Sequence, residues 1–87
     1  MPYIPQEDRE EFDYLGSGAW TRRPDTVGEL NFAITMLCKR WLDRYGTSYA
    51  TLNEVIGVLE CVKLELYRRM AAPYEDRKRD QNGEVFA

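Results

Sequence analysis

The chain has 87 residues, the length of one small domain, and its 12 basic and 15 acidic residues give a net charge of −3. This acidic balance argues against a protein whose main work is to neutralise nucleic-acid phosphates. Hydrophobic residues make up 44% and charged residues 31% of the sequence, a composition typical of a folded, soluble protein. No run of about 18 apolar residues is present, so no membrane span is expected.

Several kinds of chemistry lack their usual residues in this sequence. There is no histidine, which is the commonest general base and metal ligand. The two cysteines, Cys38 and Cys61, form neither a disulfide framework nor a metal-binding pattern. We therefore expect a non-enzymatic protein without a cofactor or a bound metal, in a reducing, cytoplasmic setting.

The N-terminal part, residues 1–25, is the least regular and is expected to form an arm. A short helix is predicted over residues 6–15, where acidic residues in the first turn suit a helix start. Gly16 and Gly18 are expected to break this helix. Trp20 is expected to anchor the arm on the helices that follow.

A first long helix is predicted over about residues 27–45. Thr26 and Glu29 have the spacing of a capping box, in which each side chain accepts a hydrogen bond from the other residue's amide. Gly46 is a natural stop, because glycine adopts the left-handed conformation that ends many helices. The apolar stripe of this helix consists of Leu30, Ala33, Ile34, Leu37, Cys38, Trp41 and Tyr45.

A second long helix is predicted over about residues 52–72, with Thr51 and Glu54 as its capping box. Pro73 is expected to end or kink this helix. Its core-facing stripe consists of Leu52, Val55, Ile56, Leu59, Val62, Leu66 and Met70. Because the link between the two long helices is short, they are predicted to form an antiparallel hairpin in an all-α fold.

The expected organisation is a single helical domain over residues 1–87, with a hairpin at 26–72 and a tail at 73–87. The tail is predicted to hold a short helix from Pro73 to Gln81, followed by a stop at Asn82 and Gly83. Its last apolar residues, Val85 and Phe86, either tuck back against the core or fray.

Apolar residues also lie outside the two stripes, and they predict a second covered surface. A glycine inside a helix costs about 1 kcal/mol relative to alanine, so a close neighbour is expected at Gly57. Two alternatives are open: the N-terminal arm covers this surface, or another subunit does. In the second case the chain forms a homo-oligomer whose interface contains Phe32, Met36, Gly57, Cys61 and Leu64.

A possible ligand site lies near the end of the second long helix. Lys63 falls within the apolar face, so its ammonium either reaches water along an apolar stem or is buried and binds an anion. Basic residues interleaved with aromatic ones can contact a nucleotide. The residues of this alternative are Lys63, Tyr67, Arg68, Arg69 and Tyr74. Against it, Glu65 can pair with the arginines and neighbouring acids nearly cancel the charge, as on an exposed mixed-charge helix.

A third alternative is a metal-dependent helical nucleotide hydrolase. Such enzymes hold magnesium with paired carboxylates on one helix face, and Glu7 and Glu10 have a suitable spacing. In contrast, Glu60 and Glu65 are five positions apart, which places them on different faces.

Three segments carry a family resemblance: Met1-Pro-Tyr-Ile-Pro5 and the residues up to Arg9, residues 28–34, and residues 49–76 with the core Asn53-Glu-Val-Ile-Gly-Val-Leu-Glu-Cys61. They resemble a family of small uncharacterised proteins of unknown function that occur in bacteriophage and prophage-like genes. The resemblance implies a phage-type accessory protein that binds a host protein or sequesters a nucleotide signal. The chain departs from the family pattern in residues 12–25.

Overall fold

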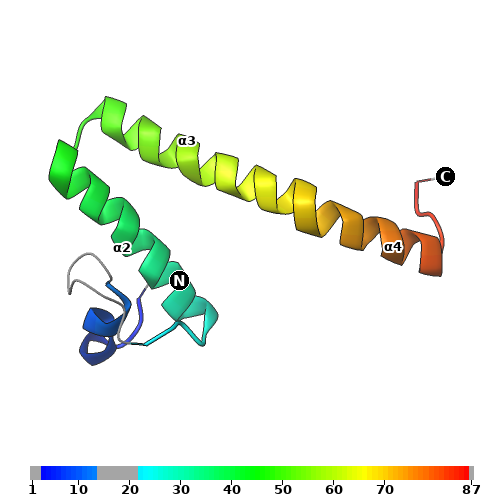
Figure 1. The fold of residues 1–87 in the computed structure, drawn as a ribbon, viewed down its shortest axis with the longest axis horizontal. Coiled ribbons are helices and arrows are strands. Elements are labelled where there is room, and N and C mark those ends of the chain that lie inside the picture. Colours follow the sequence, from blue (N-terminus) through cyan, green and yellow to red (C-terminus); the bar gives the residue numbers. More distant parts are fainter. Residues whose placement is uncertain (1–2, 14–21, 87) are drawn as a thin grey trace. The chain divides into compact units, whose positions relative to one another are not determined.

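The computed structural model describes residues 3–13 and 22–86, and all regular elements among them are helices (Figure 1). These elements are the 3-10 helix η1 (Gln6–Phe12), the α-helices α2 (Val27–Tyr45) and α3 (Tyr49–Leu66), the π-helix η2 (Tyr67–Ala71) and the α-helix α4 (Ala72–Asn82). The all-α prediction is therefore confirmed. No helix in the described part has the length and apolar character that crossing a bilayer requires.

The chain divides into two compact units, Met1–Leu52 and Asn53–Ala87, and the boundary falls inside α3. The antiparallel hairpin and the single domain over residues 1–87 stay predictions.

Helix α2 has the predicted bounds, because local signals fix both of its ends. The amide of Glu29 donates to the Thr26 hydroxyl over 3.1 Å, and the amide of Thr26 donates to the Glu29 carboxylate over 3.2 Å. These two bonds complete the capping box. At the other end Gly46 has a φ of 84°, a conformation that disfavours any residue with a Cβ.

The carboxylate of Glu29 makes the start of α2 sensitive to acid. The pKa of Glu29 is lowered from its ordinary value of 4.5, first by the hydrogen bond from the Asp25 amide and also by Arg22. A lowered folded-state pKa gives stability that is complete above the ordinary value and is lost as pH falls through the folded value. We expect the helical circular dichroism of the wild type to fall in that acid range.

The matched variant for this prediction is Glu29→Gln. Glutamine can still accept in a capping box but does not titrate, so the acid-dependent loss should become smaller in the variant. An unchanged acid profile would assign the loss to other carboxylates.

The N-terminal segment forms the small core of the first unit by packing against α2. Phe12 is 0% exposed, and the other buried apolar residues are Ile4, Phe32 and Ala33, with Met36 packed against them. The predicted helix over residues 6–15 is present as η1 as far as Phe12. The described residues do not include the predicted break at Gly16 and Gly18 or the predicted anchor Trp20.

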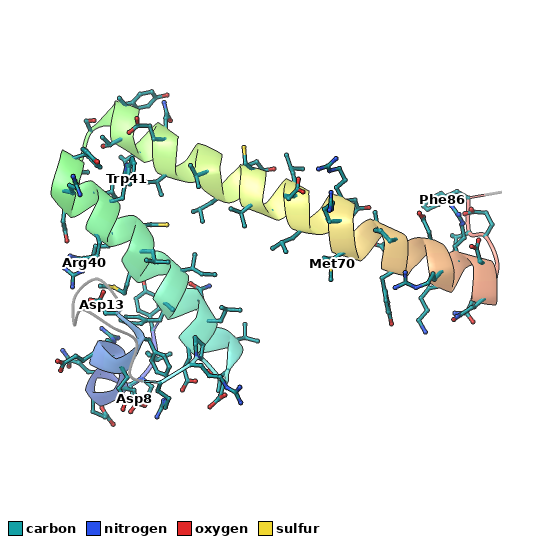
Figure 2. The ribbon with its side chains drawn as sticks, in the orientation of Figure 1. Asp8, Asp13, Arg40, Trp41, Met70 and Phe86 are labelled. Carbon is teal, nitrogen blue, oxygen red and sulfur yellow. The ribbon has the colours of Figure 1, made fainter. Side chains whose placement is uncertain are left out.

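Polar contacts fasten both ends of this segment. Near its start, Arg9 Nε donates to the carbonyl oxygen of Ile4 over 3.1 Å, and the Arg9 guanidinium lies 5.7 Å from the centre of the Phe32 ring. At its end, the buried Asp13 carboxylate accepts hydrogen bonds from Nε and Nη2 of Arg40 on α2 (Figure 2). The hydrogen bond with Asp13 raises the pKa of Arg40 above its ordinary value.

The apolar stripe of α2 is less buried than expected. Ala33 lies in the core, but the large residues Leu30, Ile34, Leu37, Trp41 and Tyr45 are 39–53% exposed. The core of the first unit therefore forms where the N-terminal segment packs against Phe32 and Ala33 of α2. The large residues of the predicted stripe lie outside this core.

The start of the second long helix differs from the prediction. Helix α3 begins at Tyr49, three residues before the predicted residue 52. The amide of Ser48 donates to Thr51 Oγ1 over 2.9 Å, and the amide of Thr51 donates to Ser48 Oγ over 3.2 Å. Ser48 and Thr51 thus form the reciprocal pair that was expected from Thr51 and Glu54.

Pro73 was expected to end or kink the second long helix and to begin a short helix. Helix α3 ends at Leu66, and α4 (Ala72–Asn82) has Pro73 in its first turn, so the short helix predicted over Pro73–Gln81 is confirmed. Proline lacks an amide hydrogen, and its ring clashes with the carbonyl four residues back in a regular α-helix. The chain avoids this clash by widening into the π-helix η2, where the amide of Ala72 donates to the Tyr67 carbonyl, five residues back. Helix α4 then continues to Asn82, and Gly83, with a φ of 100°, provides the predicted stop.

Candidate interaction surface of the C-terminal helices

The second unit exposes its apolar residues. No residue of α3, η2 or α4 is buried. The large apolar residues are 40–66% exposed: Ile56, Val58, Leu59, Val62, Leu64, Leu66, Tyr67, Met70 and Tyr74. Helices in proteins gain most of their stability by packing an apolar face, and a large exposed apolar surface marks an interaction site. This surface is therefore the candidate functional site.

A shallow groove crosses this surface at the π-helix. It is lined by Lys63, Leu66, Tyr67, Met70, Ala71, Tyr74 and Glu75. Its floor is apolar, whereas its two ends carry opposite charges, with a lysine toward α3 and a glutamate in α4. Met70, labelled in Figure 2, belongs to the middle of the groove.

Helical spacing explains why these residues share one side. Leu66, Met70 and Tyr74 are spaced by four positions. Residues three or four positions apart are neighbours on the surface of a helix. The run stays helical from α3 through η2 to α4, so these side chains stay on one side past Pro73.

The structure shows Lys63 with its ammonium in solvent. Its side chain is 70% exposed, and Nζ lies 3.2 Å from Glu60 Oε1. Of the two alternatives for this residue, the apolar stem with an exposed charge is the one observed. A buried ammonium is not present at this position.

The five candidate ligand residues come together only in part. Lys63, Tyr67 and Tyr74 line the groove. Arg68 instead pairs with Glu65 over 2.8 Å, as the helical spacing predicted, and Arg69 is not among the lining residues. The groove thus presents one cation and one carboxylate, and not a cluster of cations that would converge on an anion.

The candidate interface residues also divide into two groups. Phe32 is buried by the N-terminal segment of its own chain, and Met36 packs beside it. At Phe32 the arm therefore provides the cover that the sequence left open, whereas Met36 is half-buried and its place in an interface stays a prediction. Cys61 and Leu64 are exposed, and a Cβ added at Gly57 would meet no atom within 4 Å. An interface through these three residues stays a prediction.

Substitutions at Gly57 test the interface predicted through Gly57, Cys61 and Leu64. With open space around it, Gly57→Ala should stabilise the helix by about 1 kcal/mol, measured by thermal unfolding. Gly57→Leu should lower the mass of the assembly, measured by light scattering, if another backbone approaches closely at this position. An unchanged mass would remove Gly57 from the interface.

The carboxylates proposed for magnesium lie in the first unit. Glu7 and Glu10 are both on η1, a helix with about three residues per turn, so they share a side of it. Within residues 3–13 and 22–86, no group of three or more side chains of the metal-ligating types comes together. No observed geometry singles out this pair as a catalytic site.

Sequence reasoning missed part of the groove. It assigned Leu66 and Met70 to the core of the hairpin, gave Ala71 no role, and treated Glu75 only as an acid that offsets the neighbouring basic charge. The available signal was the spacing of three and four positions, which continues from Lys63 past Pro73 to Glu75 as on one face of a helix.

A family model matches most of the chain. The model of a family described as a domain of unknown function (DUF6899) matches residues 1–85. Comparison with curated proteins gives no match, and neither does comparison with solved structures.

Proposed function

The chain belongs to the family described as a domain of unknown function (DUF6899), and on this premise we propose that it is a non-enzymatic accessory protein that acts by self-assembly through its C-terminal helices. One observation carries the proposal. The second unit has an apolar surface along its helices but no buried residue of its own in α3, η2 or α4. Covering such a surface is favourable in water, and large exposed apolar surfaces mark interaction sites.

Helix lengths support a partner outside the chain. The consecutive helices α3, η2 and α4 contain 18, 5 and 11 residues. At about 1.5 Å per residue they extend roughly 50 Å, whereas the 19 residues of α2 extend only about 28 Å. Even complete pairing of α2 along this run would leave its C-terminal part uncovered. A second copy of the chain supplies apolar surface of the required length.

Sequence features support the proposed setting. The resemblance to small proteins of bacteriophage and prophage-like genes supports an accessory role in the cytoplasm, with a host protein as a further partner of the assembly. The net charge of −3 argues against nucleic acid as the partner.

Native mass spectrometry of the purified protein tests this proposal, because it reports the number of chains and any retained small molecule together. We expect two or more chains per particle and a helical signal that rises with protein concentration. A single chain at about 100 µM would overturn the proposal, since any self-association would then be weaker than about 5.5 kcal/mol.

A second candidate function is the binding of an anionic nucleotide in the groove. The observation in its favour is that Lys63, Tyr67 and Tyr74 line the same groove. A ligand that binds only the native state adds about 2.7 kcal/mol of stability at 100 times its dissociation constant. A panel of nucleotides in a thermal-shift assay should therefore raise the melting temperature of the wild type more than that of Lys63→Met. A panel without any shift would remove this candidate.

A further inference from the structure

We propose that the groove binds the groove of a second copy of this chain in an antiparallel, two-fold arrangement, with Lys63 of each copy against Glu75 of the other. This inference rests on the proposed self-assembly and specifies its site and geometry.

The charge pattern of the groove selects this arrangement. Lys63 lies at one end of the lining and Glu75 at the other, with apolar residues between them. In a two-fold interface, residue i of one copy meets residue j of the other, and the reverse contact occurs as well. An antiparallel pair therefore brings unlike charges together twice. A parallel pair in register would place lysine against lysine and glutamate against glutamate, which costs free energy.

The apolar floor fits the same symmetry. The position midway between Lys63 and Glu75 is 69, so the two-fold axis passes beside Met70. Met70 is 66% exposed and lines the groove, and it would contact its own counterpart across the axis. The neighbouring Ala71 has a small side chain, which leaves room for the second helix.

Both charged groups are available for this contact. The pair between Lys63 and Glu60 joins side chains that are 70% and 54% exposed, and such surface pairs contribute little stability. Within the described residues, Glu75 makes no ion pair. Replacing the Lys63–Glu60 ion pair by a pair between two copies therefore costs the single chain little stability.

A charge-reversal cycle tests the pairing, with dissociation constants measured by analytical ultracentrifugation. Lys63→Glu and Glu75→Lys should each weaken association about tenfold, because each change creates two like-charge contacts per dimer. The double variant should return to within about threefold of the wild type, since its charges are again opposite. Glu65→Lys is the matched control: it makes the same charge change as Glu75→Lys outside the groove and should leave association unchanged.

Cross-linking distinguishes the two orientations. In a background with Cys38→Ser and Cys61→Ser, Met70→Cys should form an intermolecular disulfide under mild oxidation, because its position lies beside the axis. Leu59→Cys, on the same apolar stripe but far from the axis, should not. Disulfides at both positions would indicate a parallel pair and would overturn the proposal.

The remaining outcomes separate this inference from the proposed function. A multimer whose double variant shows no rescue, or in which Met70→Cys forms no disulfide, would overturn the groove pairing and leave self-assembly standing. A wild type that stays a single chain would overturn both.

Discussion

Replacement of Phe12 by alanine is expected to release the N-terminal segment from α2. Phe12 is 0% exposed and lies among Ile4, Phe32 and Ala33, which form the core of the first unit. The loss of a buried phenylalanine costs about 3–5 kcal/mol through lost transfer free energy and the cavity that remains. That loss is a large part of the stability of a folded protein, about 5–15 kcal/mol. Amide hydrogen exchange at Phe32 and Ala33 should therefore accelerate strongly, and the denaturant midpoint should fall.

The matched control for this change is Phe86→Ala. It removes the same atoms from a side chain that is 94% exposed, so neither amide exchange nor the denaturant midpoint should change. Amide exchange at Phe32 that stays as slow in Phe12→Ala as in the wild type would contradict this prediction. It would mean that the packing of η1 does not protect this part of α2.

The second large effect is expected from Met70→Asp, which places a charge in the middle of the groove. A carboxylate at this position would be desolvated between two apolar surfaces, so association should weaken by about 100-fold or more. The readout is the dissociation constant of the assembly. Because Met70 is exposed in the single chain, the fold of the first unit should be unaffected.

Leu64→Asp is the control for Met70→Asp and also discriminates between two surfaces. Leu64 is exposed to a similar degree, at 54% compared with 66%, but it does not line the groove. We expect little effect on association from this change. The reverse result, a large effect at Leu64 and none at Met70, would transfer the interface to the surface of Gly57, Cys61 and Leu64.

The fold could be predicted wherever local signals were unambiguous. Helix α2 has its predicted bounds because Thr26, Glu29 and Gly46 act through short-range hydrogen bonds and backbone conformation. The start of α3 was placed too late because two capping pairs overlap at Thr51. The earlier pair, with Ser48, adds three residues to the helix and uses the Thr51 hydroxyl, so Glu54 is not needed.

The candidate site could be predicted only in part, because it depends on features with weak sequence signals. Lys63, Tyr67 and Tyr74 were identified from their basic and aromatic character, but Pro73 was expected to end or kink the helix. The π-helix that leads up to Pro73 leaves no distinct residue pattern in the sequence. Likewise, the sequence left open what covers Phe32, and only the packing of η1 shows that the arm does so.

The absence of buried residues in α3, η2 and α4 has a consequence for the lifetime of the protein in a cell. A helix that is held mainly by another molecule opens when that molecule is absent, and proteases cut open segments. Newly made chains at low abundance would then be trimmed beyond Leu52, while chains that have met a second copy would persist. The amount of intact protein would rise more steeply than its rate of synthesis, so the helical surface would act as a threshold on accumulation.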